Sequence, residues 1–184
     1  TNSYGNMVSS FFGAKFGKHI EELLISPLPN WVILAGYVAG ALLRGLMVGA
    51  VVLAVSLFFT PIEVQHPLVM LSVLLLTAIV FALAGMVNAI FAQKFDDIAI
   101  IPTFVLAPLT YLGGVFYSIS LLPEFWQGVS VFNPILYMVN GFRYGMLGVS
   151  DVSLALSYGV ILTAGAVLFA WCLYLLHRGT GLRS

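Results

Sequence analysis

Four long hydrophobic runs alternate with short polar stretches along the 184 residues of this chain. A helix needs about 20 residues to cross the apolar core of a bilayer, and each run reaches that length. The runs are Trp31–Phe59, Leu68–Ala92, Ile98–Tyr117 and Leu154–Leu176, and none contains Asp or Glu. Strands of a membrane barrel would alternate in polarity, and these runs do not, so the pattern predicts four membrane-spanning helices.

Two prolines lie inside the third of these runs. Pro102 and Pro108 each remove an intrahelical hydrogen bond, and Gly113 and Gly114 follow them. Proline inside a helix tends to kink it. The sequence therefore predicts that the third span is bent.

The composition excludes a soluble domain. Apolar residues make up 61% of the chain and charged residues 8%, against roughly 45–50% and 25% in soluble domains. Basic and acidic residues balance at 7 each, and no basic run is present that would neutralise a row of phosphates, which disfavours nucleic-acid binding. The phosphate-loop and zinc-protease motifs are absent as well, so we expect no enzymatic activity, no metal and no cofactor bound by this chain.

The basic residues fall almost entirely on one side of the predicted spans. Because consecutive spans alternate in direction, the polar stretches form two groups, with five basic residues in one and one in the other. The five are Lys15, Lys18, Lys94, Arg178 and Arg183, and the single one is Arg143. The positive-inside rule then predicts a cytoplasmic C-terminus and an external 118–153 segment.

A short amphipathic helix is predicted at Gly17–Leu28, on the cytoplasmic side. Pro27 and Pro29 end it. Its apolar positions are Ile20, Leu23 and Leu24, and its polar positions are Lys18, Glu21 and Glu22. Two interpretations stay open: the apolar edge anchors in the membrane interface, or the helix docks a cytoplasmic partner protein.

Arg44 stands alone inside the first run. It lies about 20 Å along the helix from Trp31, near mid-depth. A buried arginine needs a partner, and we expect backbone carbonyls, water in a cavity, another subunit or a segment outside this sequence. Arg44 then lines a transport path or a subunit contact, unless it snorkels to the interface.

The external segment is rich in aromatic residues, including Trp126, and contains two helix-start signals. Pro123 begins one predicted helix, Pro123–Val131; Asn133 followed by Pro134 reads as N-cap and first position of a second, Pro134–Leu147. We expect both to dip into the outer leaflet, with simple anchoring as the alternative. Arg143 would meet lipid headgroups or Asp151.

Three stretches resemble the membrane subunits of ABC-2 type transporters, most closely the YadH-like inner-membrane permeases of bacteria. They are FFGAKFGKHIEELLISPLP (Phe11–Pro29), KFDDIAIIPTFVLAPLTYLGGVFYS (Lys94–Ser118) and LPEFWQGVSVFNPILYMVNGFRYGMLG (Leu122–Gly148). The last matches the family pattern of Asn-Pro followed by tyrosine and arginine, here Asn133, Pro134, Tyr137 and Arg143. The resemblance covers essentially the whole chain.

The resemblance implies an all-α, type V exporter-like transmembrane domain over residues 1–184, about four full spans plus part of another. It implies that the first span and part of the second are missing, with Thr1–Phe12 as the inner end of the latter. It makes Gly17–Ser26 the coupling helix, which docks on a separate cytoplasmic ABC ATPase that carries ATP and Mg. It also implies pairing with a second copy in the bacterial inner membrane and re-entrant external helices.

Three other functions remain as alternatives. A secondary transporter or channel-like protein would need no ATPase, but such transporters usually couple ions through intramembrane acids. An intramembrane enzyme would need convergent polar groups at one depth. A fragment without independent activity is the third.

Overall fold

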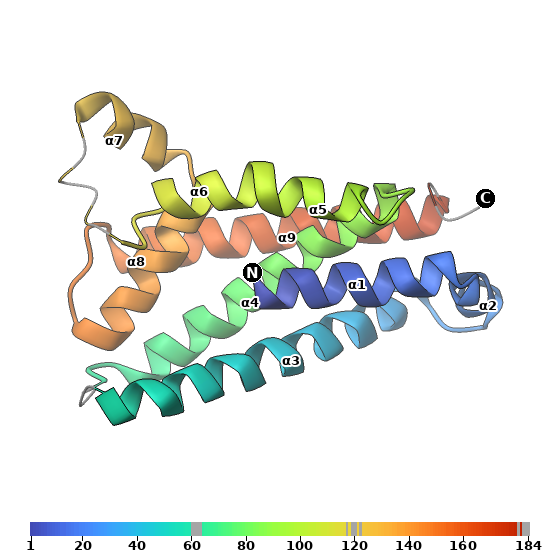
Figure 1. Cartoon of the computed structure of the whole chain (residues 1–184), viewed down its shortest axis with the longest axis horizontal. Helices are drawn as coiled ribbons and strands as arrows, with labels where there is room; N and C mark the ends of the chain where they lie inside the picture. Colours follow the sequence, from blue (N-terminus) through green and yellow to red (C-terminus); the bar gives the residue numbers. More distant parts are fainter. Residues whose placement is uncertain (60–63, 117, 119–120, 122, 180, 182–184) are drawn as a thin grey trace.

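The computed structural model describes residues 1–59, 64–116, 118, 121, 123–179 and 181, with the side chains of Glu21 and Leu24 left out. The described residues form an all-helical bundle (Figure 1). Its elements are α1 (Asn2–Phe16), α2 (His19–Ile25), α3 (Asn30–Phe59), α4 (Pro67–Phe91), α5 (Asp97–Ile101), the π-helix η1 (Pro102–Leu106), α6 (Ala107–Leu112), α7 (Glu124–Val131), α8 (Pro134–Leu147) and α9 (Leu154–Arg178).

Three of the described helices are long and apolar enough to cross a membrane: α3, α4 and α9. With 30, 25 and 25 residues, they extend about 45, 38 and 38 Å. Large apolar side chains of α3, such as Leu43, Met47 and Phe58, are exposed. Such a surface is unfavourable in water and suited to lipid. The three spans predicted here are confirmed as helices.

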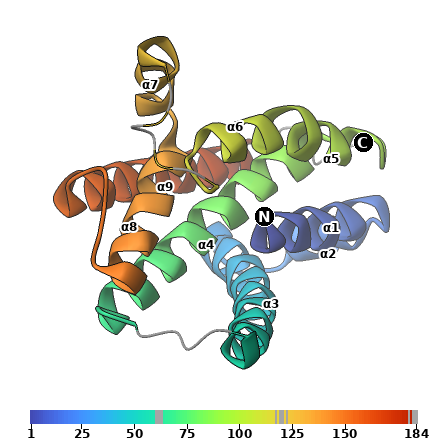
Figure 2. The ribbon, with the colours of Figure 1, turned by 60° about the vertical axis from the view of Figure 1, so that its left-hand side comes forward.

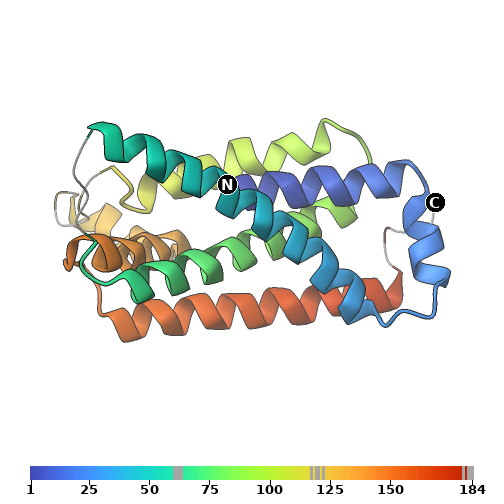
Figure 3. The same ribbon diagram turned by 90° about the horizontal axis from the view of Figure 1, so that it is seen from below.

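The main core lies between α1 and α4. The buried face of α1 includes Tyr4, Met7 and Phe11, and α4 contributes Leu83 and Met86 to the same cluster. The approach is close because α4 has a glycine here: a Cβ on Gly85 would lie 2.7 Å from the Tyr4 carbonyl oxygen. The first helix is therefore central to the packing, and its N-terminal end lies midway along the bundle (Figures 1 and 3).

The third predicted span, Ile98–Tyr117, is shorter than the sequence indicated. Its helix runs from Asp97 through η1 to Leu112, below the length of the other three, and ends where Gly114 takes a φ of 74°. The expected bend takes the form of η1, in which Ala107 N–H donates to the Pro102 carbonyl. Pro102 itself cannot donate to Ile98, and the Asn88 side chain of α4 donates to that carbonyl instead, at 3.3 Å.

The bundle has two distinct ends. One end holds α2, the α4–α5 turn and the C-terminal end of α9; the other holds α7, α8 and the start of α4 (Figures 1 and 3). At the second end, His66 N–H donates to the Gly145 carbonyl at 2.8 Å. The structure thus separates Lys15, Lys18, Lys94 and Arg178 from Arg143, as the predicted topology requires; Arg183 lies outside the described residues.

Candidate functional site

The amphipathic segment folds as α2, a shorter helix than the predicted Gly17–Leu28. It begins after Lys18, whose φ of 59° breaks it from α1, and ends at Ser26, which is extended before Pro27 and Pro29. Left-handed backbone is uncommon for lysine, so a sharp corner separates α1 from α2. Figure 3 shows α2 lying across the end of the bundle.

The apolar side of α2 faces the protein itself. Ile20 is 1% exposed and belongs to the main core, and Leu23 packs half-buried against it. The opposite side presents Lys18, Glu22 and Ile25, and Ile25 is 85% exposed. The Ile20 edge is therefore packed against the bundle. The predicted Glu21 and Leu24 side chains lie outside those described.

Arg44 has a neutral partner that none of the sequence expectations named. Its Nη1 donates to the Asn6 side-chain oxygen of α1 at 3.3 Å, and Arg44 remains exposed. It lines a groove of about 360 Å³ between α1, α2 and α3, with Ser10, Gly36 and Gly40 among the lining residues. The guanidinium is therefore held by one amide and keeps further donors free for another group.

The two short helices that the sequence predicted in the 118–153 segment form where it placed them, as α7 and α8. The Asn133 side chain caps α8 by accepting from Ile135 N–H at 3.0 Å, with Pro134 at the first helical position. Tyr137 is 7% exposed and donates through its hydroxyl to the Val131 carbonyl at 2.8 Å, which ties α8 to the end of α7. Trp126 is 44% exposed on α7, which stands apart from the other helices (Figure 2).

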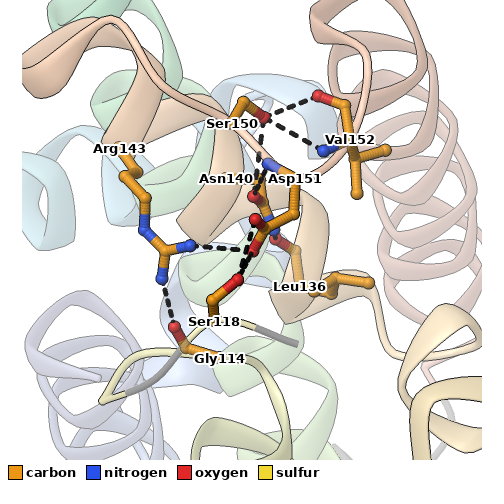
Figure 4. A network of polar contacts seen from close by, with 8 residues as sticks. All are labelled: Gly114, Ser118, Leu136, Asn140, Arg143, Ser150, Asp151 and Val152. Atoms are coloured by element: carbon orange, nitrogen blue, oxygen red, sulfur yellow. Dashed lines mark hydrogen bonds and ion pairs between the residues drawn. The ribbon is translucent and has the colours of Figure 1, made fainter. Parts of the chain in front are cut away.

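A polar network joins α8 to the α6–α7 connection and to the α8–α9 connection (Figure 4). Arg143 pairs with Asp151 at 3.0 Å and donates to the Gly114 carbonyl at 2.5 Å. Ser118 donates to the Asp151 carboxylate at 2.8 Å, and Asn140 accepts from Asp151 N–H at 2.9 Å. Of the two expected partners of Arg143, the structure places Asp151 against it.

One acidic side chain outside this network, that of Asp97, binds backbone N–H groups. Asp97 accepts from Gln93 N–H and Lys94 N–H at 2.9 and 3.0 Å. These hydrogen bonds hold the pKa of its carboxyl below the usual value, so the charged form stabilises the α4–α5 turn at neutral pH. Among the described residues, no group of three His, Cys, Asp or Glu side chains is placed to hold a metal ion.

The fold and these features define a multi-span helical membrane protein with a short corner helix at one end of the bundle and a pair of short helices at the other. The sequence matches the ABC-2 type transporter family over residues 1–147. The chain belongs to that family, and it is a multi-pass, ABC-2 type inner-membrane transport permease.

Individual relatives agree with this assignment. The Inner membrane transport permease YadH of Escherichia coli (strain K12) is 56% identical over 184 residues, which is 100% of this chain and 72% of that protein. Nodulation protein J of Rhizobium leguminosarum bv. viciae is 27% identical over 168 residues, which is 91% of this chain and 65% of that protein. No solved structure matches the chain.

Proposed function

We propose that this permease exports its substrate with energy from ATP, which a separate cytoplasmic ABC ATPase binds with Mg and hydrolyses. The exposed side of α2 carries this proposal. Lys18, Glu22 and Ile25 all face outward, and together they offer a partner protein an apolar contact with charged groups around it, the arrangement of a polar-rimmed interface. The inner side of the same helix is anchored by Ile20 in the core, so force applied to α2 reaches the bundle.

The proposed docking needs α2 in the cytoplasm. The basic residues Lys15, Lys18, Lys94 and Arg178 share the α2 end of the bundle, which the positive-inside rule assigns to the cytoplasm. The C-terminus then lies inside, and α7 and α8 lie outside as re-entrant or anchoring helices. The exposed Phe125, Trp126 and Phe132 suit an outer membrane interface.

Two permease copies would form the path, with Arg44 facing the path or the second copy. Support comes from its exposure in the middle of α3 and from the single amide that holds it. An arginine at that depth is costly unless it is paired or hydrated. A second subunit or a water-filled path would supply acceptors for the guanidinium donors that Asn6 does not bind.

A secondary transporter is the second candidate. Its proton or ion coupling would rely on acidic side chains within the membrane. The four apolar runs contain neither Asp nor Glu, which favours an external energy source.

Co-purification of the full-length permease with a co-expressed ABC ATPase tests the proposal. Glu22→Arg and Ile25→Glu should each reduce the recovered ATPase at least about tenfold, since the first reverses a charge in the docking surface and the second introduces one. Glu124→Arg, an exposed charge reversal at the opposite end, is the matched control and should leave recovery unchanged. Arg44→Leu should also retain the ATPase while impairing transport.

Equal ATPase recovery from the α2 variants and from wild type would refute docking at α2. Transport by Arg44→Leu at the wild-type rate would end the proposed role of that arginine.

A further inference from the structure

The last turn of α1 is clamped onto the end of α4 by one lysine. Lys15 Nζ donates to the carbonyl oxygens of Ile90 and Ala92, both at 2.7 Å. The final carbonyls of a helix have no intrahelical donor, and a cation is favoured near that negative end of the helix dipole. The ammonium thus satisfies two otherwise unpaired acceptors that belong to another element.

Aromatic packing reinforces the same contact. Phe95, in the α4–α5 turn (residues 92–96), lies edge-on to Phe12 and Phe16 of α1, with ring centroids 5.0 and 5.1 Å apart. Edge-to-face pairs of this kind stabilise beyond the area they bury. The contact therefore has a polar part, Lys15, and an apolar part, the rings of Phe12, Phe16 and Phe95. We call these residues, together with residues 90–96, the Lys15 junction.

The junction continues into α5. Asp97 fixes the turn by accepting from Gln93 N–H and Lys94 N–H. Asn88, buried on α4, donates to the Ile98 carbonyl, to which Pro102 cannot donate. A displacement of the turn is thereby passed to the start of the helix that contains η1.

On the other side, α2 follows the junction after only two residues. Gly17 N–H donates to the Gly13 carbonyl and Lys18 N–H to the Lys15 carbonyl, at 2.9 and 3.1 Å. The corner is compact, since a Cβ on Gly17 would lie 3.0 Å from the His19 ring. The connection between Lys15 and α2 is therefore short and tightly packed.

We infer that Lys15 is a positioning residue for coupling: through the carbonyls of Ile90 and Ala92 it holds α2 and the α4–α5 turn as one rigid body. Movement imposed on α2 is then delivered to α5 rather than absorbed at the corner. This rests on the proposed function, in which an ATPase moves α2.

Spin labels at His19→Cys and Asp96→Cys, both exposed positions, measure the separation across the junction by pulsed electron paramagnetic resonance. The full-length permease and its ATPase are studied in nanodiscs, without nucleotide and with Mg-ATP on a hydrolysis-deficient ATPase. With Lys15 present, the distance distribution should be narrow and the same in both states. With Lys15→Met it should broaden and differ between the states, while the ATPase still co-purifies.

Three further variants separate coupling from a merely structural role. Lys15→Arg retains donors for both carbonyls and should restore the narrow, state-independent distribution. Lys94→Met removes an exposed lysine of the same turn and should behave as wild type. If Lys15→Met does not fold, Lys15→Gln, which keeps a donor but loses the charge, should show an intermediate broadening.

A distribution that shifts between states in the wild type, or a Lys15→Met or Lys15→Gln distribution identical to wild type, overturns the inference. Failure of the proposed function would give a different result from failure of this inference. The wild-type permease would then not retain the ATPase, whereas the broadening caused by Lys15→Met would still appear in the permease alone.

Discussion

At the residue scale, the common feature is a backbone carbonyl without a helical donor that receives one from a neighbouring helix. A carbonyl at the end of a helix, or one whose donor position holds proline, lacks its usual intrahelical partner and needs another donor. The donor and acceptor pairs are Lys15 with Ile90 and Ala92, Asn88 with Ile98, Asn133 with Leu109, and Arg143 with Gly114. The few polar side chains therefore determine which helices are fastened to each other, and where.

Two substitutions compare the members of the Arg143–Asp151 ion pair. Arg143→Gln should lower the free energy of unfolding by about 1–3 kcal/mol, because the glutamine amide is shorter and uncharged, and the buried Gly114 carbonyl loses the charged donor that Arg143 supplies. Asp151→Asn should cost only about 0.2–1 kcal/mol, as expected of a partly exposed ion pair, since the amide still accepts from Ser118. Denaturant unfolding of the purified permease in detergent measures both.

Glu124→Gln, an exposed carboxylate on α7, provides the control and should leave the unfolding free energy unchanged. A loss for Asp151→Asn equal to or larger than that for Arg143→Gln would show that the ion pair, and not the carbonyl contact, matters more.

Whether the partner of a polar residue could be predicted depends on how far apart the two residues lie in the sequence. The cap at Asn133 and the pairing of Arg143 with Asp151 were accessible because each partner lies within eight residues. The Arg44 partner, Asn6, and the Lys15 acceptors lie on other helices. Apolar periodicity does not specify how helices are rotated against each other, so those contacts came only from the structure.

At the element scale, helix ends were predicted well where proline or a polar cap marks them. The runs Leu68–Ala92 and Leu154–Leu176 became Pro67–Phe91 and Leu154–Arg178. The third span failed at its outer end, because Gly113 and Gly114 end the helix five residues before the apolar run does. A run of apolar residues indicates which segment can lie in lipid, but it does not indicate the residue at which the helix ends.

The α1–α4 contact provides an element-scale prediction. Gly85→Ala should lower the unfolding free energy by about 1–3 kcal/mol, because the new Cβ would meet backbone, the Tyr4 carbonyl oxygen at 2.7 Å, which cannot move aside as a side chain can. Thermal unfolding in detergent measures the change.

Gly159→Ala on α9 is the matched control. A Cβ there meets open space, so the substitution should be neutral or stabilise the helix by up to about 1 kcal/mol. Equal destabilisation by the two substitutions would contradict close α1–α4 packing as the cause.

At the scale of the whole molecule, the bundle has a basic end formed by α2, the α4–α5 turn and the end of α9, and an aromatic end formed by α7 and α8. Sequence alone predicted this division, because the order of spans and the positions of Lys and Arg are both one-dimensional properties. It did not predict that the apolar edge of α2 is packed in the core and that Ile25 faces outward.

Labelling of single cysteines with a membrane-impermeant maleimide tests the central claim most directly. The full-length permease would carry Glu22→Cys on α2 or Glu124→Cys on α7, both at exposed positions, and would be labelled in spheroplasts before and after the membrane is permeabilised. Glu124→Cys should react in intact spheroplasts, and Glu22→Cys only after permeabilisation. Reaction of Glu22→Cys in intact spheroplasts would place α2 outside the cell, beyond the reach of any cytoplasmic ATPase.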